Sequence, residues 1–402
     1  MKSRLAIAIV VYSLMVATFA NNALSTIYVI YESRFGFSSL SVTAIFATYA
    51  VAVLVALLCV GRLSDDIGRK PLLIVGSLLL IGSTVLFLVA TGTPYLFAGR
   101  AMMGLSTGTL TAAGTAAMVD LEPRHDRKRA SLQTTIGFLT GAAFGPLVFG
   151  VVAQYLPRPT MTPFLVELVL QLLALVGVVY MGEPATHQLK AMTWKIQRPS
   201  IPADIRRLFV LAGFVVSIGW MVGGIYGSLS GSLDRQLLHV KSHAVAGVVL
   251  FVFAFIGGAS QFLFRLRPAR TAMLVGVAAT AIGIVIVEGA LYAVSAPLFL
   301  VATVVAGIGN GLCFIGSLSL VNEIAAPDKR AELVAAYNVV AYFALSLPVI
   351  GVGVMANVFG LKTATVLFAA MLTALCVVTL RALSSTSRNP AAVVVSIEVG
   401  EV

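Results

Sequence analysis

The 402-residue chain is 59% hydrophobic and only 11% charged. Because a soluble globular domain carries about one charged residue in four, this composition excludes an ordinary soluble protein and indicates an integral membrane protein. The formal net charge of +11 is compatible with nucleic-acid binding, but the basic residues are spread over loops between apolar runs, which favours a role in membrane topology. The three cysteines fall within apolar runs and are odd in number, which does not suit a disulfide framework.

Apolar runs follow one another along almost the whole chain. Runs of ~18 residues with almost no charge are long enough to span a bilayer as helices, and their continuous apolar character excludes the alternating strands of a membrane barrel. Lys2 and Arg4 precede the first run as in a signal peptide, but this run is too long and lacks a small-residue cleavage site, so we expect a retained helix. Twelve transmembrane helices are predicted near residues 5–31, 40–60, 72–91, 94–119, 131–155, 162–181, 207–230, 243–264, 271–291, 295–321, 333–357 and 361–381.

The distribution of Lys and Arg predicts the topology. An even number of helices places both termini on one side, and 21 of the 27 basic residues fall in the loops of that side, against five on the other and Arg100 within a helix. The positive-inside rule therefore predicts a multi-pass protein of the cell inner (plasma) membrane with both termini in the cytoplasm.

The longest internal polar segment, Gly182–Arg206, divides the chain into two halves. We predict an N-terminal six-helix bundle over 1–182 and a cytoplasmic linker over 183–206, with a short surface helix near Leu189–Ile196. A C-terminal six-helix bundle then covers 207–383, and a small polar tail over 384–402 is expected to be disordered.

The two halves resemble repeats. The segment Gly104–Gly108 matches Gly307–Gly311 about 200 residues later, and three more matches occur at nearly the same offset. Two parallel six-helix repeats related by an axis along the membrane normal are one established transporter architecture. The expected fold is therefore an all-α integral membrane protein with two pseudo-symmetric bundles. The three further matches are Gly68–Gly76 with Pro268–Gly276, Arg129-Ala130 with Arg330-Ala331, and Pro146 with Pro348.

A polar loop with the sequence Gly-Arg-Leu-Ser-Asp-Asp-Ile-Gly-Arg-Lys-Pro joins the second and third predicted helices over residues 61–71. This pattern closely resembles the signature loop of major facilitator superfamily transporters, which implies the twelve-helix fold and alternating access. The resemblance also implies a conformational gate that holds the cytoplasmic side shut in the outward-facing state, against the simpler alternative of an ordinary positively charged loop. The gate residues would be Gly61, Asp65, Gly68, Arg69, Lys70 and Asp120.

Each gate residue has an expected part. Gly61 should let the second helix end tightly, and Gly68 should adopt a positive φ angle. Asp65 should meet the N-terminus of a neighbouring helix, where a negative charge is favoured. Arg69 and Lys70 should pair with Asp120.

The fifth predicted helix carries small residues at every fourth position. Such a stripe lets another helix approach closely, and the proline within it should bend the helix. The pattern resembles the antiporter motif of the twelve-helix drug/proton antiporters, which is the sequence argument for export, with Phe149 departing from the usual glycine. The alternative is generic helix packing. The residues are Gly137, Gly141, Gly145, Pro146 and Gly150.

Arg100 is the one basic residue within a predicted span, where burial costs roughly 2.5–3.5 kcal/mol on insertion scales. Its surroundings resemble the fourth-helix motif linked to proton coupling in the same antiporters, and it begins a small polar stripe expected to face the cavity: Arg100, Gly104, Thr107, Thr111, Gly114 and Thr115. The alternative is a structural arginine that extends to the membrane surface.

Candidates for the proton carrier are few. Glu167 is the acid clearly within a span and should either pair with Arg100 or titrate itself. Glu32, near an outer helix end, is the second candidate. Asn21 and Asn22 stand where many relatives place an acid, so the identity of the carrier, and proton coupling itself, stay open.

The resemblance implies that the first, fourth, seventh and tenth helices line the substrate cavity, with the eleventh adding to it. Amides and aromatic rings there suit a fairly apolar solute that is uncharged or cationic, although an asparagine within a helix serves equally in interhelical hydrogen bonding. His239 and His243 have a metal-binding spacing but fall in an outer loop, so no metal site is expected. The cavity candidates are Asn21, Asn22, Thr26, Trp220, Tyr226, Asn310, Asn338 and Tyr342.

The predicted function is proton-coupled efflux of small, fairly apolar molecules by a monomeric transporter in the lipid bilayer. No cofactor is expected, because the proton gradient would supply the energy, and no nucleic-acid partner is expected. The alternative is an importer or facilitator of a sugar or other small metabolite with the same fold. A membrane enzyme or non-transporting protein is a remote alternative, since the sequence offers neither a soluble catalytic domain nor a cluster of His, Asp and Glu at one membrane depth.

Overall fold

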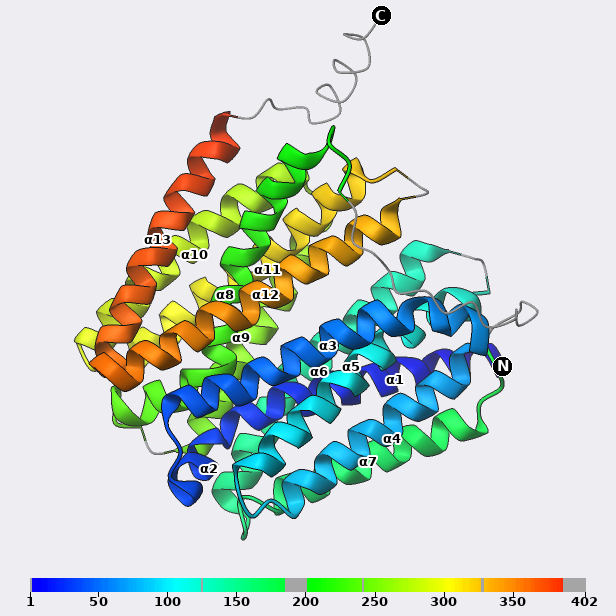
Figure 1. The fold of residues 1–402 in the computed structure, drawn as a ribbon, viewed down its shortest axis with the longest axis horizontal. Coiled ribbons are helices and arrows are strands. Elements are labelled where there is room, and N and C mark those ends of the chain that lie inside the picture. Colours follow the sequence, from blue (N-terminus) through cyan, green and yellow to red (C-terminus); the bar gives the residue numbers. More distant parts are fainter. Residues whose placement is uncertain (1, 124–125, 185–200, 241, 327–328, 386–402) are drawn as a thin grey trace, which may run out of the picture. The chain divides into compact units, whose positions relative to one another are not determined.

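The computed structural model describes residues 2–123, 126–184, 201–240, 242–326 and 329–385. Over these residues every regular element is helical (Figure 1), which confirms the predicted all-α fold. The helices are α1 (Lys2–Ala23), η1 (Leu24–Thr26), α2 (Tyr28–Phe35), α3 (Ser39–Ile67), α4 (Arg69–Leu88), α5 (Thr93–Leu121), α6 (Arg127–Tyr155), α7 (Thr162–Tyr180), α8 (Arg206–Gln236), α9 (His243–Phe264), α10 (Ala269–Tyr292), α11 (Ala296–Ile324), α12 (Arg330–Phe359) and α13 (Leu361–Ser385).

The first predicted helix is interrupted rather than continuous over 5–31. It ends at Ala23, continues as the 3-10 helix η1, and resumes as α2 after Ile27. The amide of Asn22 donates to the main-chain oxygen of Thr18 at 3.0 Å, and the hydroxyl of Thr26 donates to that of Ala23 at 2.8 Å. Such local bonds compete with regular helix geometry, which explains the break.

Eleven of the described helices are long and apolar enough to cross a membrane. The twelfth predicted span is α5, which has 29 residues but is rich in Gly, Ser and Thr. The additional helix α2 arises from the break after α1. The predicted linker helix near 189–196 and the tail beyond residue 385 lie outside the described residues.

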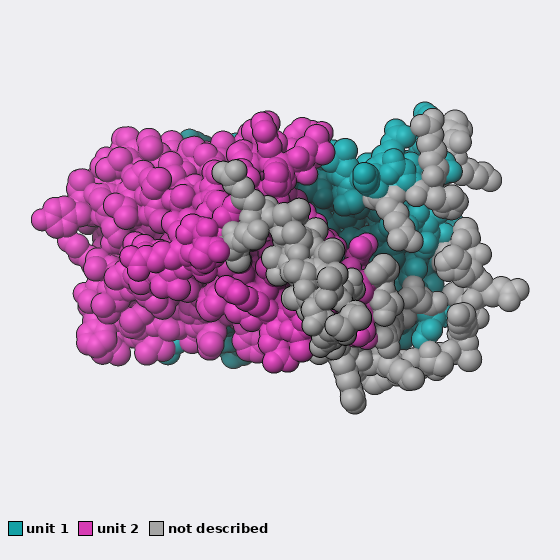
Figure 2. Space-filling model, turned by 90° about the horizontal axis from the view of Figure 1, so that it is seen from above, with its two compact units in different colours: residues 1–197, 227–235, 240–251 teal, residues 198–226, 236–239, 252–402 magenta. Residues whose placement is uncertain are grey.

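The chain forms two compact units, coloured teal and magenta in Figure 2. Unit 1 comprises residues 1–197, 227–235 and 240–251, and unit 2 comprises 198–226, 236–239 and 252–402. Helices α8 and α9 therefore each contribute residues to both units. The division into bundles at 1–182 and 207–383 stays a prediction.

Small residues allow the helices within each unit to pack closely. In unit 1, α1 packs on α6, and α5 packs on both α3 and α4, whereas in unit 2 the most extensive packing joins α10 and α11. A Cβ atom added to Gly104 would lie 2.5 Å from the main-chain oxygen of Tyr49, and one added to Gly276 would lie 2.7 Å from the main-chain nitrogen of Cys313. Only glycine permits such an approach of two helix backbones.

Candidate functional site

A buried ion pair lies at the α3–α4 turn of unit 1. The Nε atom of Arg69 donates to Oδ2 of Asp120 at 2.9 Å, with the two side chains 7% and 13% exposed. The NH1 atom of Arg69 donates to Oγ of Ser64 at 2.8 Å. The predicted pairing of Arg69 with Asp120 is thus formed, and it ties together the start of α4 and the end of α5.

Other expectations for this loop need correction. Gly61 does not end the second helix, because α3 continues through it to Ile67 and only Gly68 separates α3 from α4. Gly68 has the expected positive φ, +105°. The ammonium of Lys70 forms no ion pair with Asp120, and the backbone N–H of Lys70 donates to a different carboxylate, that of Glu183. The Asp65 side chain lies outside the described part of the chain.

Sequence reasoning missed Glu183, which was assigned to the linker. Its Oε1 accepts from the backbone N–H of Arg69 at 2.8 Å, and its Oε2 accepts from that of Lys70 at 3.1 Å. A carboxylate on the free N–H groups of a helix start is stabilising. A carboxylate at the start of α4 is thus supplied by a residue 114 positions from Arg69, which no local pattern could have identified. The role predicted for Asp65 stays a prediction.

The glycine stripe of α6 faces α1 and α9 within unit 1. A Cβ atom on Gly141 or Gly145 would collide with the main-chain oxygen of Met15 or Phe19, and one on Gly137 would lie 3.0 Å from that of Val11. The stripe therefore brings two helix backbones together, as predicted. Gly150 faces α9 instead, with Gly247 opposite it, and Pro146 lies within the continuous helix α6.

Arg100 on α5 is completely buried. Its Nε donates to the hydroxyl of Tyr28, and its NH1 donates to the main-chain oxygen and Oδ1 of Asn21 at 3.1 and 3.0 Å. The guanidinium carbon also lies 5.2–5.6 Å from the ring centroids of Tyr28, Phe46 and Tyr49. Arg100 is therefore not a structural arginine that reaches the membrane surface.

Among the described residues no carboxylate forms an ion pair with Arg100. Arg100 forms no ion pair with Glu167, which corrects that expectation, and its NH2 has no hydrogen-bond partner.

The predicted polar stripe on α5 does not face one cavity, because Gly104 faces α3 and a Cβ on Gly114 would meet the side chain of Leu14. The sequence pattern identified the charge of Arg100 but did not show which faces of α5 pack against other helices.

Glu167 is held between α7 and α4. Its Oε1 accepts from the hydroxyl of Thr84 at 2.8 Å and from the amide of Gln171, whereas its Oε2 has no partner. The side chain is completely buried. A buried carboxyl with one oxygen unsatisfied is costly when ionised, so the neutral acid fits this setting better.

Glu32 lies on α2, half-buried. Its Oε2 accepts from the hydroxyl of Ser232 at 3.3 Å. Burial raises the pKa of the Glu32 carboxyl above its usual range, and this effect outweighs the hydrogen bond from Ser232 and the positive charge of Arg235, which lower it. Through its contact with Ser232, Glu32 is the candidate acid that lies next to α8 within unit 1.

The cavity candidates fall in both units, and each set is described separately. In unit 1, Asn21 holds Arg100, while the polar groups of Asn22 and Thr26 bond to the turns before them. Thr26 is buried, whereas the two asparagines are partly exposed.

In unit 2 the aromatic candidates form two groups. The ring of Trp220 packs edge-on against Tyr342, with centroids 5.0 Å apart. Tyr226 is buried, stacks on Phe253 at 4.3 Å and shares a 3.1 Å hydrogen bond with Thr303. Asn310 and Asn338 are partly exposed. Contact of these residues with a solute stays a prediction.

Comparison with known proteins identifies a family. The family model described as Major Facilitator Superfamily matches residues 10–349. The chain is 24% identical over 229 residues to Multidrug resistance protein D of Escherichia coli (strain K12), covering 54% of this chain and 55% of that protein. It is 27% identical over 260 residues to Tetracycline resistance protein, class C, of Escherichia coli, covering 60% and 62%. It is 30% identical over 134 residues to the uncharacterized MFS-type transporter YfkF of Bacillus subtilis (strain 168), covering 33% and 34%.

The chain thus spans between about a third and three-fifths of the length of these relatives. Among solved structures, its fold is similar to a bacterial homolog of the human lysosomal transporter Spinster, with a TM-score of 0.78, 14% identity and coverage of 97% of this chain and 99% of that one. A peptide transporter POT in complex with sulfate gives a TM-score of 0.78 at 14% identity, with 94% of each chain covered. At these identities the likeness concerns the fold.

Proposed function

Because the chain belongs to the major facilitator superfamily, we propose that it is a secondary active transporter that works by alternating access and exports small, fairly apolar molecules in exchange for protons. The names of the multidrug and tetracycline resistance relatives support export. The basic residues of the loops support cytoplasmic termini in the cell inner membrane. Fold alone does not identify a substrate, so the proposal depends on the site.

The observation that carries the proposal is the uncompensated charge of Arg100. A guanidinium buried in a membrane helix is costly and marks a functional site by default. It is held in place by Tyr28 and Asn21, yet one of its nitrogens has no partner. A group so placed favours negative charge nearby, whether an acid that has released its proton or an electron-rich group of the solute.

Glu167 and Glu32 are the acids proposed to carry the proton. One proton crossing ~100 mV releases about 2.3 kcal/mol, which supports a roughly fifty-fold concentration gradient of the exported molecule. The aromatic and amide side chains around Trp220 in unit 2, and Asn21 in unit 1, suit a solute with little charge. The predicted gate around Arg69 and Asp120 would act on access rather than on substrate choice.

Transport in proteoliposomes tests the proposal. The full chain is reconstituted, a pH gradient is imposed, and proton movement is recorded while a panel of apolar dyes, antibiotics and metabolites is added. We expect at least one compound to drive proton flux, and E167Q or E32Q to abolish it. If compounds move but no variant of Arg100, Glu167 or Glu32 alters proton flux, the antiport proposal is wrong.

One observation favours the second candidate, an importer or facilitator of a sugar or other small metabolite. Asn21 contacts Arg100 and carries no charge, so the first helix offers no acid at this point. A facilitator would equilibrate its solute without regard to the pH gradient. Accumulation against a solute gradient in the same vesicles separates the two candidates.

A further inference from the structure

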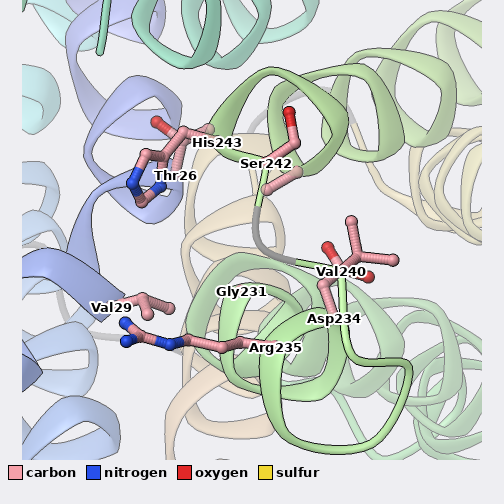
Figure 3. A pocket seen from close by; sticks show the side chains of 9 residues that line it. Thr26, Val29, Gly231, Asp234, Arg235, Val240, Ser242 and His243 are labelled. Atoms are coloured by element: carbon pink, nitrogen blue, oxygen red, sulfur yellow. The ribbon is translucent and has the colours of Figure 1, made fainter. Parts of the chain in front are cut away.

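A pocket of about 140 Å³ lies within unit 1, away from Arg100 and the α3–α4 turn. Its walls come from three segments: η1 with the start of α2, the last turn of α8, and the residues that lead into α9 (Figure 3). The residues on which the argument depends are Thr26, Asp234, Arg235, Ser242 and His243.

Asp234 is the unusual member of this pocket. Its side chain is 3% exposed and its Oδ2 has no hydrogen-bond partner. Leaving a buried carboxylate oxygen unpaired is costly, and native structures rarely do so without a reason. Asp234 also lies in the last turn of α8, where the free carbonyl groups of a helix end make negative charge less favourable. Both effects would be relieved by a cation.

Two positive side chains of the described lining, Arg235 and His243, do not pair with Asp234. In Figure 3 the guanidinium of Arg235 points away from it toward Val29, and the ring of His243 lies on the side of Thr26. Among the described residues Asp234 forms no ion pair.

Two hydroxyl groups of the pocket are available as further acceptors. That of Thr26 donates to the main-chain oxygen of Ala23, and that of Ser242 accepts from the backbone N–H of Val245 at 3.4 Å. Each hydroxyl oxygen has two lone pairs and keeps at least one for a donor in the pocket. The lining of the pocket thus holds two hydroxyl acceptors besides the carboxylate of Asp234.

We propose that this pocket binds a small organic cation, a primary ammonium or guanidinium group, which pairs with Asp234. A cavity of ~150 Å³ accepts a molecule of the size of benzene, so a short alkylammonium fits and a drug-sized molecule does not. A metal ion would lack ligands, because the described residues contain no group of three or more His, Cys, Asp or Glu that could hold one. The binding is separate from transport and does not depend on the proposed function.

Isothermal titration calorimetry on the purified full chain in detergent at neutral pH tests the site. The probe is n-propylammonium chloride, with n-propanol as the neutral analogue and sodium chloride as the salt control. We expect binding of the ammonium in the millimolar range, none of the alcohol, and at least a tenfold loss in D234N. E288Q, which removes an acid of unit 2 outside the pocket, should bind like the wild type.

R235Q provides an effect of opposite sign. Removing a positive charge from the rim should tighten ammonium binding several-fold, and this result remains decisive if D234N does not fold, which its melting temperature would show. The proposal is overturned if the wild type does not bind the ammonium, because the Asp234 carboxyl would then bind only a proton. It is equally overturned if n-propanol binds as well, if D234N binds unchanged, or if R235Q binds no more tightly.

Discussion

Helices α5 and α11 occupy corresponding places in the two halves of the sequence and show what the repeat shares. Gly104 of α5 packs against the backbone of α3, and a Cβ on Gly307 of α11 would lie 2.8 Å from the main-chain oxygen of Phe253 on α9. In both halves small residues four apart let two helix backbones meet. The packing of the repeat is therefore the same on both sides.

One turn earlier the two helices differ. Arg100 of α5 bonds to the hydroxyl of Tyr28, whereas Thr303 of α11 bonds to the hydroxyl of Tyr226. In each half a tyrosine hydroxyl bonds to the residue at this position of the repeat, but that residue is charged only in the first half. The comparison teaches that the repeat supplies a scaffold and that the charged chemistry was added to one copy.

The helix turns at the start of α4 and α10 differ in the same way. In the first half, Glu183 accepts from the N-terminus of α4. In the second half, Arg270 of α10 donates to the main-chain oxygen of Leu383, at the end of α13, at 2.9 Å. A carboxylate on a helix start and a cation on a helix end are both favourable, so two opposite charges secure equivalent connections.

The largest expected effect separates Arg100 from its counterpart. R100M should lower transport at least ~10-fold, because the methionine cannot supply the charge. It should also lower the free energy of unfolding by about 1–3 kcal/mol, because the Tyr28 hydroxyl and Asn21 Oδ1 lose their donor. T303V should leave transport within twofold of the wild type. Solute flux in proteoliposomes and melting temperature in detergent measure the two quantities. Equal losses in both variants would show that the charge is not what distinguishes the halves.

Asp120 and Glu323 sharpen the comparison at the ends of α5 and α11. D120N should lower the free energy of unfolding by about 3 kcal/mol, because it removes a charged partner from the buried guanidinium of Arg69. E323Q is the matched control, since Glu323 is exposed and such changes stay within about 0.5 kcal/mol. Thermal unfolding of both variants decides, and a stable D120N would mean that the Arg69–Asp120 ion pair contributes little to stability.

The glycines test the shared packing. A Cβ on Gly108 would lie 2.5 Å from that of Ala56, and one on Gly311 would collide with the main-chain oxygen of Gly257. G108A and G311A should therefore each cost about 1–3 kcal/mol through overpacking. Melting temperatures of the two variants should fall together, and a loss confined to one of them would break the equivalence of the two helix pairs. G351A, at a glycine with open space around it, is the control.

The two terminal contacts should contribute less. E183Q and R270Q each remove a charge from a helix end and should each lower stability by about 1 kcal/mol. Raising the salt concentration should reduce both effects, because the contacts lie near the ends of the helices. Chemical denaturation at low and high salt measures this, and an effect that does not depend on salt would argue for packing rather than charge.

The smallest expected effect is a pH dependence at Glu32. Because burial raises the folded-state pKa of this carboxyl above its usual range, the folded chain holds the proton more tightly than the unfolded chain. Stability therefore falls as the pH rises from the usual pKa through the folded-state pKa. E32Q removes this dependence, so its stability relative to that of the wild type should rise as the pH is raised through the range in which the carboxyl titrates. Arg235 and Ser232, which face Glu32, stay unchanged in both proteins. A difference that is constant with pH would mean that Glu32 does not titrate in this range.

Much of the architecture follows from local properties of the sequence. Runs of apolar residues predict the spans because a bilayer accepts only helices with satisfied backbones, and Gly68 was predictable because a positive φ angle favours glycine. The stripe from Gly137 to Gly145 predicted a close helix contact, because glycine lets two helix backbones approach each other. The break before Tyr28 was not predicted, since it depends on side-chain bonds of Asn22 and Thr26 that compete with the helix only weakly.

The sequence by itself therefore determined the membrane spans, the repeat and the presence of one charge within a span, because hydropathy, spacing and charge are properties of the chain. Only the tertiary structure decided which groups meet. Glu183 accepts from the start of α4 although it lies in a distant segment, and Arg100 donates to Tyr28 and forms no ion pair with Glu167. Asp234 lines a pocket in which its Oδ2 has no hydrogen-bond partner. These contacts join residues far apart in sequence, and their energies depend on burial, which a linear pattern does not contain.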